Sequence, residues 1–239
     1  ELKRRSETNR IRLQDRPPWR GMILDRDGQV LVGNRPSYEL VAVLEDVADI
    51  NLLARRLASL LKMDVKQLVT TLEAARAANL SQVRLRTDLT WDELALISTY
   101  QPELPGASIQ IQPKLEYRQK GMAAHALGYL GEITEAQLKS SRFASNYKMG
   151  DYVGRCGVEL AWDNYLQGKR GYRRIEVDAY GREFGQLNQM FASPGANVFL
   201  TLNTHLQREA EACLEGKTGA IVAVDPRNGK ILAMASSPS

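Results

Sequence analysis

Two short motifs in this sequence could serve acyl transfer. Ser59 and Lys62 form a Ser-x-x-Lys pattern, in which a serine hydroxyl attacks an acyl carbon and a lysine amine one helical turn away accepts its proton. Residues 217–219 spell Lys-Thr-Gly, a triplet that accompanies such a serine in one class of acyl-transfer enzymes. A self-contained serine acyl-transfer enzyme that uses Ser59 and Lys217 is therefore one hypothesis for this chain.

The expected position of Ser59 argues against this hypothesis. The apolar spacing predicts a helix that begins near residues 49–51 and ends near 62–64, so Ser59 would lie in its last turn. A nucleophilic serine is favoured at the opposite end, where the helix dipole stabilises negative charge. Measured from Leu53 at the centre of the apolar face, Ser59 lies about 120° and Lys62 about 180° around the helix. Both side chains are predicted to face solvent, where a lysine serves poorly as a base.

The remaining residue types predict no other catalytic or ligand site. No Ser-x-Asn or Tyr-x-Asn motif occurs in the 239 residues, so Lys-Thr-Gly is interpreted as the entry to a buried strand at 220–224. Neither His125 nor His205 lies in the sequence context of a catalytic triad. Cys156 and Cys213 lack the spacing of metal ligands. The sequence therefore predicts no catalytic, cofactor-binding or metal-binding residue.

The composition is typical of a folded globular protein, with 44% hydrophobic and 25% charged residues. No apolar run reaches the roughly 20 residues that span a membrane. The net charge of +4 suits an anionic neighbour without identifying one. A nucleic-acid-binding module is a weaker hypothesis, because acidic residues interrupt the N-terminal basic run and only one tryptophan there could stack on a base. The basic residues of this run are Lys3, Arg4, Arg5, Arg10, Arg12, Arg16 and Arg20.

The hydrophobic pattern is β-like over residues 22–44. A hairpin is expected at 22–32, with Gly28 at the positive-φ position of its turn, and a separate strand at 38–44. Residues 50–140 are mainly helical, with short strands expected at 83–85 and 107–111. Helix starts are marked in capping-box spacing by Asp64 with Gln67, Thr90 with Glu93, and Thr134 with Gln137.

From residue 150 the pattern is β-rich again. Glycines at 150, 154 and 157 precede an expected helix over 158–166 that ends at Gly168. Thr204 is expected to cap a helix that runs to Cys213. Further strands are expected at 173–179, 196–202, 219–225 and 230–235, with turns at 180–183, 194–195 and 225–229.

The order of the short motifs resembles the pedestal of the class B penicillin-binding proteins. Arg-Gly-x-Ile-x-Asp-Arg-x-Gly begins at residue 20, and Gly-Arg-x-Gly-Val-Glu begins at residue 154. Each motif is weak alone, but they follow the family order along the chain. Within this family, the segment at about 37–150 is more similar to the elongation type, penicillin-binding protein 2, than to the division type. The residues that carry the resemblance as structural motifs are Arg20, Gly21, Asp25, Arg26, Gly28, Gly154, Arg155, Gly157, Glu159 and Gly168.

The resemblance implies an α+β fold with three parts. Residues 1–36 and 150–200 would form an extended β-rich anchor, and residues 37–149 an inserted α/β head subdomain. Residues 201–239 would be the first helix and strands of an α/β transpeptidase domain. Asn203 departs from the family, which usually has Asp at this position.

The resemblance also implies a function. The chain would be the non-catalytic pedestal of a peptidoglycan D,D-transpeptidase that β-lactams acylate, and it would need no cofactor. The catalytic Ser-x-x-Lys, Ser-x-Asn and Lys-Thr-Gly would lie beyond residue 239, and a single membrane anchor would precede residue 1. Expected partners are the membrane glycosyltransferase of the elongation complex, its periplasmic scaffold protein and a possible second copy, with no nucleic acid. The expected location is the extracytoplasmic face of the bacterial inner membrane.

Overall fold

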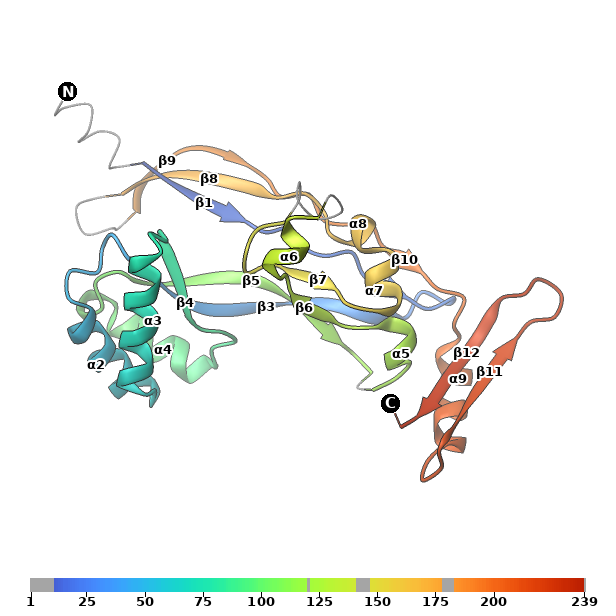
Figure 1. The fold of residues 1–239 in the computed structure, drawn as a ribbon. Helices are drawn as coiled ribbons and strands as arrows, with labels where there is room; N and C mark the ends of the chain where they lie inside the picture. The colour runs from blue at the N-terminus through green and yellow to red at the C-terminus, as the bar shows by residue number, and fades with distance from the viewer. Residues whose placement is uncertain (1–10, 120, 141–146, 178–182, 239) are drawn as a thin grey trace. The chain divides into compact units, whose positions relative to one another are not determined.

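The computed structural model describes residues 11–119, 121–140, 147–177 and 183–238, which fall into two compact units (Figure 1). Unit 1 comprises residues 1–16, 36–114 and 171–191, and unit 2 comprises 17–35, 115–170 and 192–239. Most of the N-terminal basic run, and residues 180–182 of the turn expected at 180–183, lie outside the described residues.

Unit 1 is built on three helices and the strand segments that they cover. Helices α2 (Ile50–Leu61), α3 (Val65–Ala77) and α4 (Trp91–Thr99) gather around β4 (Gln82–Arg86) and the end of β3 (Val30–Val43), as Figure 1 shows. Antiparallel pairing of Val41 with Arg84 fixes the register of β3 and β4. The core includes Leu40, Leu53, Leu57, Leu72, Ile97 and Leu104, all of which are almost fully buried.

Side-chain caps define the starts of these helices, because the first backbone N–H groups of a helix have no partner within it. Asp49 accepts a hydrogen bond from Leu52 N, and Asp64 accepts one from Lys66 N. Thr90 and Glu93 form a reciprocal capping box at α4. The cap predicted at Asp64 and the capping box predicted for Thr90 with Glu93 are therefore confirmed, but Asp64 bonds to Lys66 N and forms no reciprocal box with Gln67.

Unit 1 also contains a three-stranded antiparallel sheet. Its strand order is β1 (Ile11–Arg16), β8 (Gly171–Val177) and β9 (Glu183–Met190). Leu13 pairs with Arg174 across β1 and β8, and Arg174 pairs with Asn188 across β8 and β9.

Unit 2 is centred on short strands and short helices. Strand β2 (Ile23–Leu24) pairs antiparallel with the start of β3 and parallel with β10 (Val198–Phe199). Strands β6 (Leu130–Glu132) and β7 (Tyr152–Gly154) form a separate pair. Strand β5 (Ala107–Tyr117) pairs with β3 and, like β3, has residues in both units. The unit 2 helices before residue 200 are α5 (Ala124–Leu127), α6 (Glu135–Leu138), α7 (Gly157–Ala161) and α8 (Asp163–Leu166). Unit 1 also has a short 3-10 helix at Gln101–Glu103.

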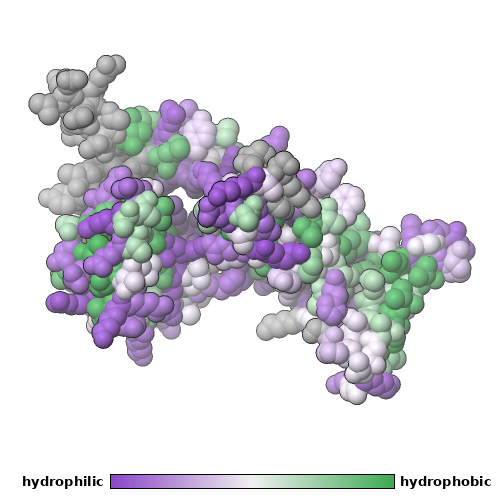
Figure 2. All heavy atoms as spheres, viewed as in Figure 1, coloured by the Kyte–Doolittle hydropathy of each residue, from purple (hydrophilic) through white to green (hydrophobic). Residues whose placement is uncertain are grey.

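The last part of unit 2 is helix α9 (Thr204–Cys213) with the hairpin β11 (Gly219–Val224) and β12 (Ile231–Ser237). Ala210 and Leu214 pack against Ala233 and Ala235 of the hairpin. The opposite hairpin face is exposed, and Figure 2 shows hydrophobic side chains gathered there. The prediction of a buried strand at 220–224 is therefore wrong for this structure, because only one face of the hairpin is covered. The exposed large hydrophobic residues of the hairpin are Val222, Val224, Ile231 and Met234.

The expected α+β fold is confirmed, and three local predictions need correction. The two strands expected at 29–32 and 38–44 form one continuous strand, β3. The helix expected at 158–166 is divided at Trp162 into α7 and α8. Asn203, not Thr204, caps α9, since Asn203 Oδ1 accepts hydrogen bonds from His205 N and Leu206 N. Among the described residues, the helices are too short or too polar to cross a membrane.

Candidate functional site

The residues that could serve acyl transfer do not form a catalytic arrangement. Ser59 and Lys62 are both exposed at the C-terminal end of α2, as predicted. They belong to unit 1, whereas Lys217 belongs to unit 2. The Lys217 ammonium is exposed and donates to the Cys213 carbonyl oxygen at 2.9 Å. These positions fit ordinary helix-end and turn residues.

The motif residues Arg20 and Glu159 meet in the interior of unit 2. Arg20 Nε donates to Glu159 Oε2 at 2.8 Å, and Arg20 Nη2 donates to Asp163 Oδ1 at 2.7 Å. Tyr147 Oη donates to Asp163 Oδ2, and Gly154 N donates to Asp163 Oδ1 at 3.1 Å. Arg20, Tyr147, Glu159 and Asp163, here called the Arg20 cluster, are each at most 9% exposed.

The charges of the Arg20 cluster depend on one another. The cluster places one guanidinium between two carboxylates, so each charge has a hydrogen-bonded counter-charge away from water. Burial raises the pKa of Glu159 above its usual value, although Arg20 acts in the opposite direction. Burial and the hydrogen bond to Asp163 raise the pKa of Tyr147, which keeps this phenol protonated as a donor.

Close backbone contacts explain why glycine stands at several motif positions. A Cβ atom on Gly21 would lie 1.9 Å from Ala196 O, and one on Gly154 would lie 2.2 Å from Glu159 O. Gly195, in the turn expected at 194–195, also has no room for a side chain, because an added Cβ would lie 1.9 Å from Leu166 O. The segments near residues 20, 154–168 and 195 therefore pack backbone against backbone.

Asp25 connects the turn of the β2–β3 hairpin to helix α9. Asp25 Oδ1 accepts hydrogen bonds from Asp27 N and Gln29 N at 2.9 and 2.8 Å. Asp25 Oδ2 accepts one from Thr204 Oγ1 at 2.6 Å and one from Thr204 N at 3.3 Å. Burial acts to raise the pKa of Asp25, but these hydrogen bonds outweigh it and lower the pKa below its usual value. Asp25 is fully buried, so this carboxylate fixes the start of α9 to the hairpin.

The other motif residues have separate structural positions. Arg155 Nη1 donates to Gln137 Oε1 at 2.8 Å, beside the predicted capping box of Thr134 and Gln137, which is present. Arg26 is half-exposed, with Nε 3.9 Å from Asp27 Oδ1. Three motif glycines have positive φ, namely Gly28 at 83°, Gly157 at 59° and Gly168 at 71°.

Sequence reasoning did not identify Asp163 or Tyr147 as part of this site. Asp163 lies four residues after Glu159, a spacing that places two side chains on one helix face and could have indicated a second carboxylate. Tyr147 has no comparable local signal. It reaches the cluster from a separate segment of the chain.

The Arg20 cluster is suited to a structural role. Its carboxylates are paired with a guanidinium and a phenol, and it holds neither a serine nor a histidine or cysteine nucleophile. Across the described ranges, His, Cys, Asp and Glu side chains do not gather in a group of three that could hold a metal ion. The arrangement joins chain segments and offers no reactive group.

Comparison with known proteins identifies several relatives. Residues 15–200 match the family described as the penicillin-binding protein dimerisation domain. The peptidoglycan D,D-transpeptidase MrdA of Acinetobacter baumannii is 34% identical over 100% of this chain, which spans 36% of that relative. MrdA of Escherichia coli is 30% identical over 98% of this chain, which spans 38% of that relative. The chain thus spans less than two-fifths of the length of either relative.

A solved structure has the same fold. Penicillin-binding protein 2 of Helicobacter pylori, in a complex with MreC, superposes with a TM-score of 0.76. The match covers 95% of this chain and 43% of that chain, at 23% sequence identity. The family match extends over most of the chain, and the MrdA relatives match all or nearly all of it. The chain therefore belongs to the penicillin-binding protein dimerisation domain family and corresponds to the pedestal region of the penicillin-binding protein 2 type.

Proposed function

We propose that this chain is the non-catalytic pedestal of a peptidoglycan D,D-transpeptidase. The observation that carries the proposal is the Arg20 cluster, in which family-motif residues form buried ion pairs without a nucleophile. The names of the MrdA relatives supply the reaction of the longer protein. The pedestal would hold the catalytic domain at a set distance from the membrane and support cell-wall synthesis during cell-shape maintenance.

The proposed division of labour follows the sequence-based boundaries. Residues 1–36 and 150–200 serve as the anchor, residues 37–149 as the head, and residues 201–239 as the start of the catalytic domain. The two compact units group the chain differently, because residues 115–149 belong to unit 2. The anchor, head and catalytic-domain boundaries are proposed from function, and the division into compact units does not test them. The buried contact between Asp25 and Thr204 supports a fixed connection between the anchor and the start of the catalytic domain.

Two partners are proposed for the pedestal. One is a periplasmic scaffold protein, since the similar Helicobacter pylori protein was solved in a complex with MreC. The other is the membrane glycosyltransferase of the elongation complex, which follows from the resemblance to elongation-type proteins. A second copy of the chain is a further candidate, because the family is described as a dimerisation domain. The proposed location is the extracytoplasmic face of the inner membrane, with the longer protein anchored by one transmembrane helix.

Fluorescent penicillin tests whether the chain itself is catalytic. The purified 239-residue chain is incubated with the probe and examined for covalent label after denaturation, with the full-length transpeptidase as the positive control. We expect label on the full-length protein and none on the chain. Covalent label on the chain that disappears in Ser59→Ala would support the self-contained enzyme instead.

Partner binding is tested with the same chain. Calorimetric titration with the periplasmic domain of the MreC-type scaffold is expected to show saturable binding, and sedimentation of the chain alone reports self-association. Absence of scaffold binding would remove this part of the proposal. Salt-dependent binding to DNA that falls on charge reversal at Arg4, Arg5 and Arg10 would favour the nucleic-acid hypothesis.

A further inference from the structure

The turn formed by residues 121–128, here called the α5 turn, has a strained backbone near its centre. Ala123 has a φ of 50° and a ψ of 31°, the left-handed region that is unfavourable for a residue with a Cβ atom. Gly121 and Gly128 bound the turn with φ values of 82° and 83°. A residue such as Ala123 keeps this conformation only where surrounding contacts hold it.

Helix α9 supplies the hydrogen bond that holds Ala123, which is also buried in the hydrophobic cluster that contains Met122 and Leu127. Ala123 N donates to Glu211 Oε1 at 2.7 Å, and Gln207 Nε2 donates to the same oxygen at 2.7 Å. Gln207 is almost fully buried, and its amide pairs with both backbone groups of Met234, accepting from the N–H at 2.7 Å and donating to the carbonyl at 2.9 Å. A continuous chain of hydrogen bonds therefore runs from the strained turn through α9 to strand β12.

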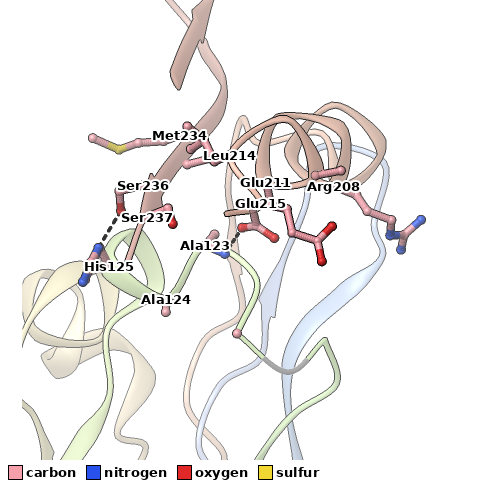
Figure 3. Close-up of a pocket in the computed structure, with 13 residues that line it drawn as sticks. Ala123, Ala124, His125, Arg208, Glu211, Leu214, Glu215, Met234, Ser236 and Ser237 are labelled. Carbon is pink, nitrogen blue, oxygen red and sulfur yellow. Dashed lines mark hydrogen bonds between the residues drawn. The ribbon is translucent and has the colours of Figure 1, made fainter. Parts of the chain in front are cut away.

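Two further contacts lie beside this chain: one joins the turn to β12, and the other joins α9 to Gln119, which precedes the turn. His125 Nδ1 lies 2.6 Å from Ser236 Oγ on β12, and Arg208 Nη2 of α9 donates to Gln119 Oε1 at 3.0 Å. Figure 3 shows Glu211 pointing at Ala123 and His125 pointing at Ser236. The α5 turn, α9 and β12 also line an open pocket of about 430 Å³.

We propose that the α5 turn is a two-position latch whose held position is set by Glu211 of α9. While α9 presents Glu211, the carboxylate compensates for the left-handed conformation of Ala123, and the turn stays in the position seen here. When that contact is lost, the strain favours rotation at Gly121 to a relaxed turn, because Gly121 has open space around it, whereas Gly128 packs against the Cys156 carbonyl. The inference rests on contacts within unit 2 and is independent of the proposed function.

The latch makes the turn and β12 respond to each other. Gln207 shares Glu211 with Ala123 and holds the backbone of Met234, so movement of β12 changes how firmly the turn is held. By thermodynamic linkage, the coupling free energy is the same in both directions. A ligand or partner that stabilises the relaxed turn therefore also destabilises the position of β12 seen here. The α5 turn is therefore a place where binding on one element alters another.

Hydrogen exchange of the whole chain tests the latch. The reporters are the amides of Ala126, Leu127 and Gly128, which donate to carbonyls of residues 123 and 124. We expect Glu211→Ala to accelerate their exchange about tenfold, because the strain at Ala123 is no longer compensated. In an Ala123→Gly background, where the left-handed conformation is unstrained, the same substitution is expected to accelerate exchange by less than about threefold.

Matched variants keep this test decisive. Glu209→Ala removes an exposed carboxylate from the same helix and is expected to leave the exchange unchanged. Glu211→Gln retains a neutral acceptor, so it is expected to accelerate amide exchange by an intermediate amount. If Glu211→Ala does not fold, Glu211→Gln takes its place in both backgrounds. Equal acceleration in the wild-type and Ala123→Gly backgrounds, or no difference between the Glu211 and Glu209 variants, would overturn the latch.

Discussion

At the scale of single residues, the buried charges of the Arg20 cluster make unit 2 sensitive to substitution at Arg20. Arg20→Met removes the guanidinium and leaves two buried carboxylates without their cation. Such a loss costs about 3–5 kcal/mol, because the remaining charges stay desolvated. We therefore expect urea denaturation at pH 7 to show a large loss of unfolding free energy.

Arg118→Met provides the control for this substitution. The Arg118 side chain is 60% exposed and its Nε lies 3.8 Å from Glu116 Oε2, so water already screens this pair. The expected loss is below about 1 kcal/mol. Similar losses in the two variants would mean that the Arg20 cluster does not contribute through its buried charge.

The raised pKa of Glu159 predicts a pH dependence with a definite sign. Burial favours the protonated form of Glu159 in the folded state more than Arg20 opposes it, so the folded chain binds this proton more tightly than the unfolded chain does. The resulting stabilisation is fully present below the unfolded pKa of about 4.3 and is lost as the pH rises through the folded pKa. The unfolding free energy of the wild type minus that of Glu159→Gln should therefore decrease as the pH rises above about 4.

Urea unfolding of both proteins over a pH series measures this difference. Glu135→Gln is a suitable control, because the Glu135 side chain is 74% exposed and its partner Lys139 is equally accessible. Because water screens this exposed pair, Glu135→Gln is expected to change the unfolding free energy by less than about 1 kcal/mol. A wild-type advantage over Glu159→Gln that grows with pH would contradict the predicted sign.

Sequence patterns identified only part of this site. Arg20 and Glu159 were identified through a resemblance, but their contact joins residues 139 positions apart, which local spacing does not encode. Asp163 had a weak signal in its spacing from Glu159, whereas Tyr147 had none. Ser59 and Lys62 were correctly predicted to face solvent, because helical periodicity alone determines which face a residue occupies.

At the scale of elements, helix starts were predictable and element lengths were less so. The caps at Asp64, Thr90 and Thr134 depend on a few neighbouring residues, so their spacing is sufficient evidence. Strand β3 continues through Pro36, which in sequence marks a break, because its extended conformation is supported by pairing with other strands. At the division between α7 and α8, Asp163 makes contacts with Arg20 and Gly154, which local sequence spacing does not encode.

A prediction about helix α9 concerns its N-cap residue, Asn203. Asn203 caps the helix and donates through Nδ2 to Asp27 Oδ2 at 2.9 Å. Asn203→Asp keeps a good capping oxygen but replaces that hydrogen bond with repulsion between two carboxylates. We expect a loss of about 0.5–1 kcal/mol in unfolding free energy from Asn203→Asp. Asn203→Ala, which removes the cap, should cost about 1 kcal/mol or more.

A second substitution separates the two effects at Asn203. In an Asp27→Asn background the repulsion is absent, so Asn203→Asp should be neutral or slightly stabilising through the helix dipole. Thermal unfolding of the four proteins in this cycle gives the interaction between the two positions. If Asn203→Asp lowers the unfolding free energy equally in both backgrounds, repulsion from Asp27 does not cause the loss.

At the scale of the whole molecule, each compact unit has a hydrophobic core of its own. The unit 1 core is centred on Leu53, Leu57 and Leu72, and a separate cluster in unit 2 includes Ile23, Val32 and Leu166. Periodicity in the sequence identified the helix stripes of the first core. The second was not predicted as a core, because its members come from short strands and turns that are far apart in the chain and have no shared period.

Separate cores predict that local unfolding is confined to one unit. Leu57 and Leu166 are both fully buried, and truncation of either to alanine should cost about 2–5 kcal/mol. Leu57→Ala should accelerate amide exchange within α2 and α3 while the amides of Gly21 and Arg26 keep their protection. Leu166→Ala should do the reverse, because those two amides donate to carbonyls inside unit 2. If either substitution instead accelerates exchange equally in both units, the chain unfolds as one cooperative body and the two cores are not independent.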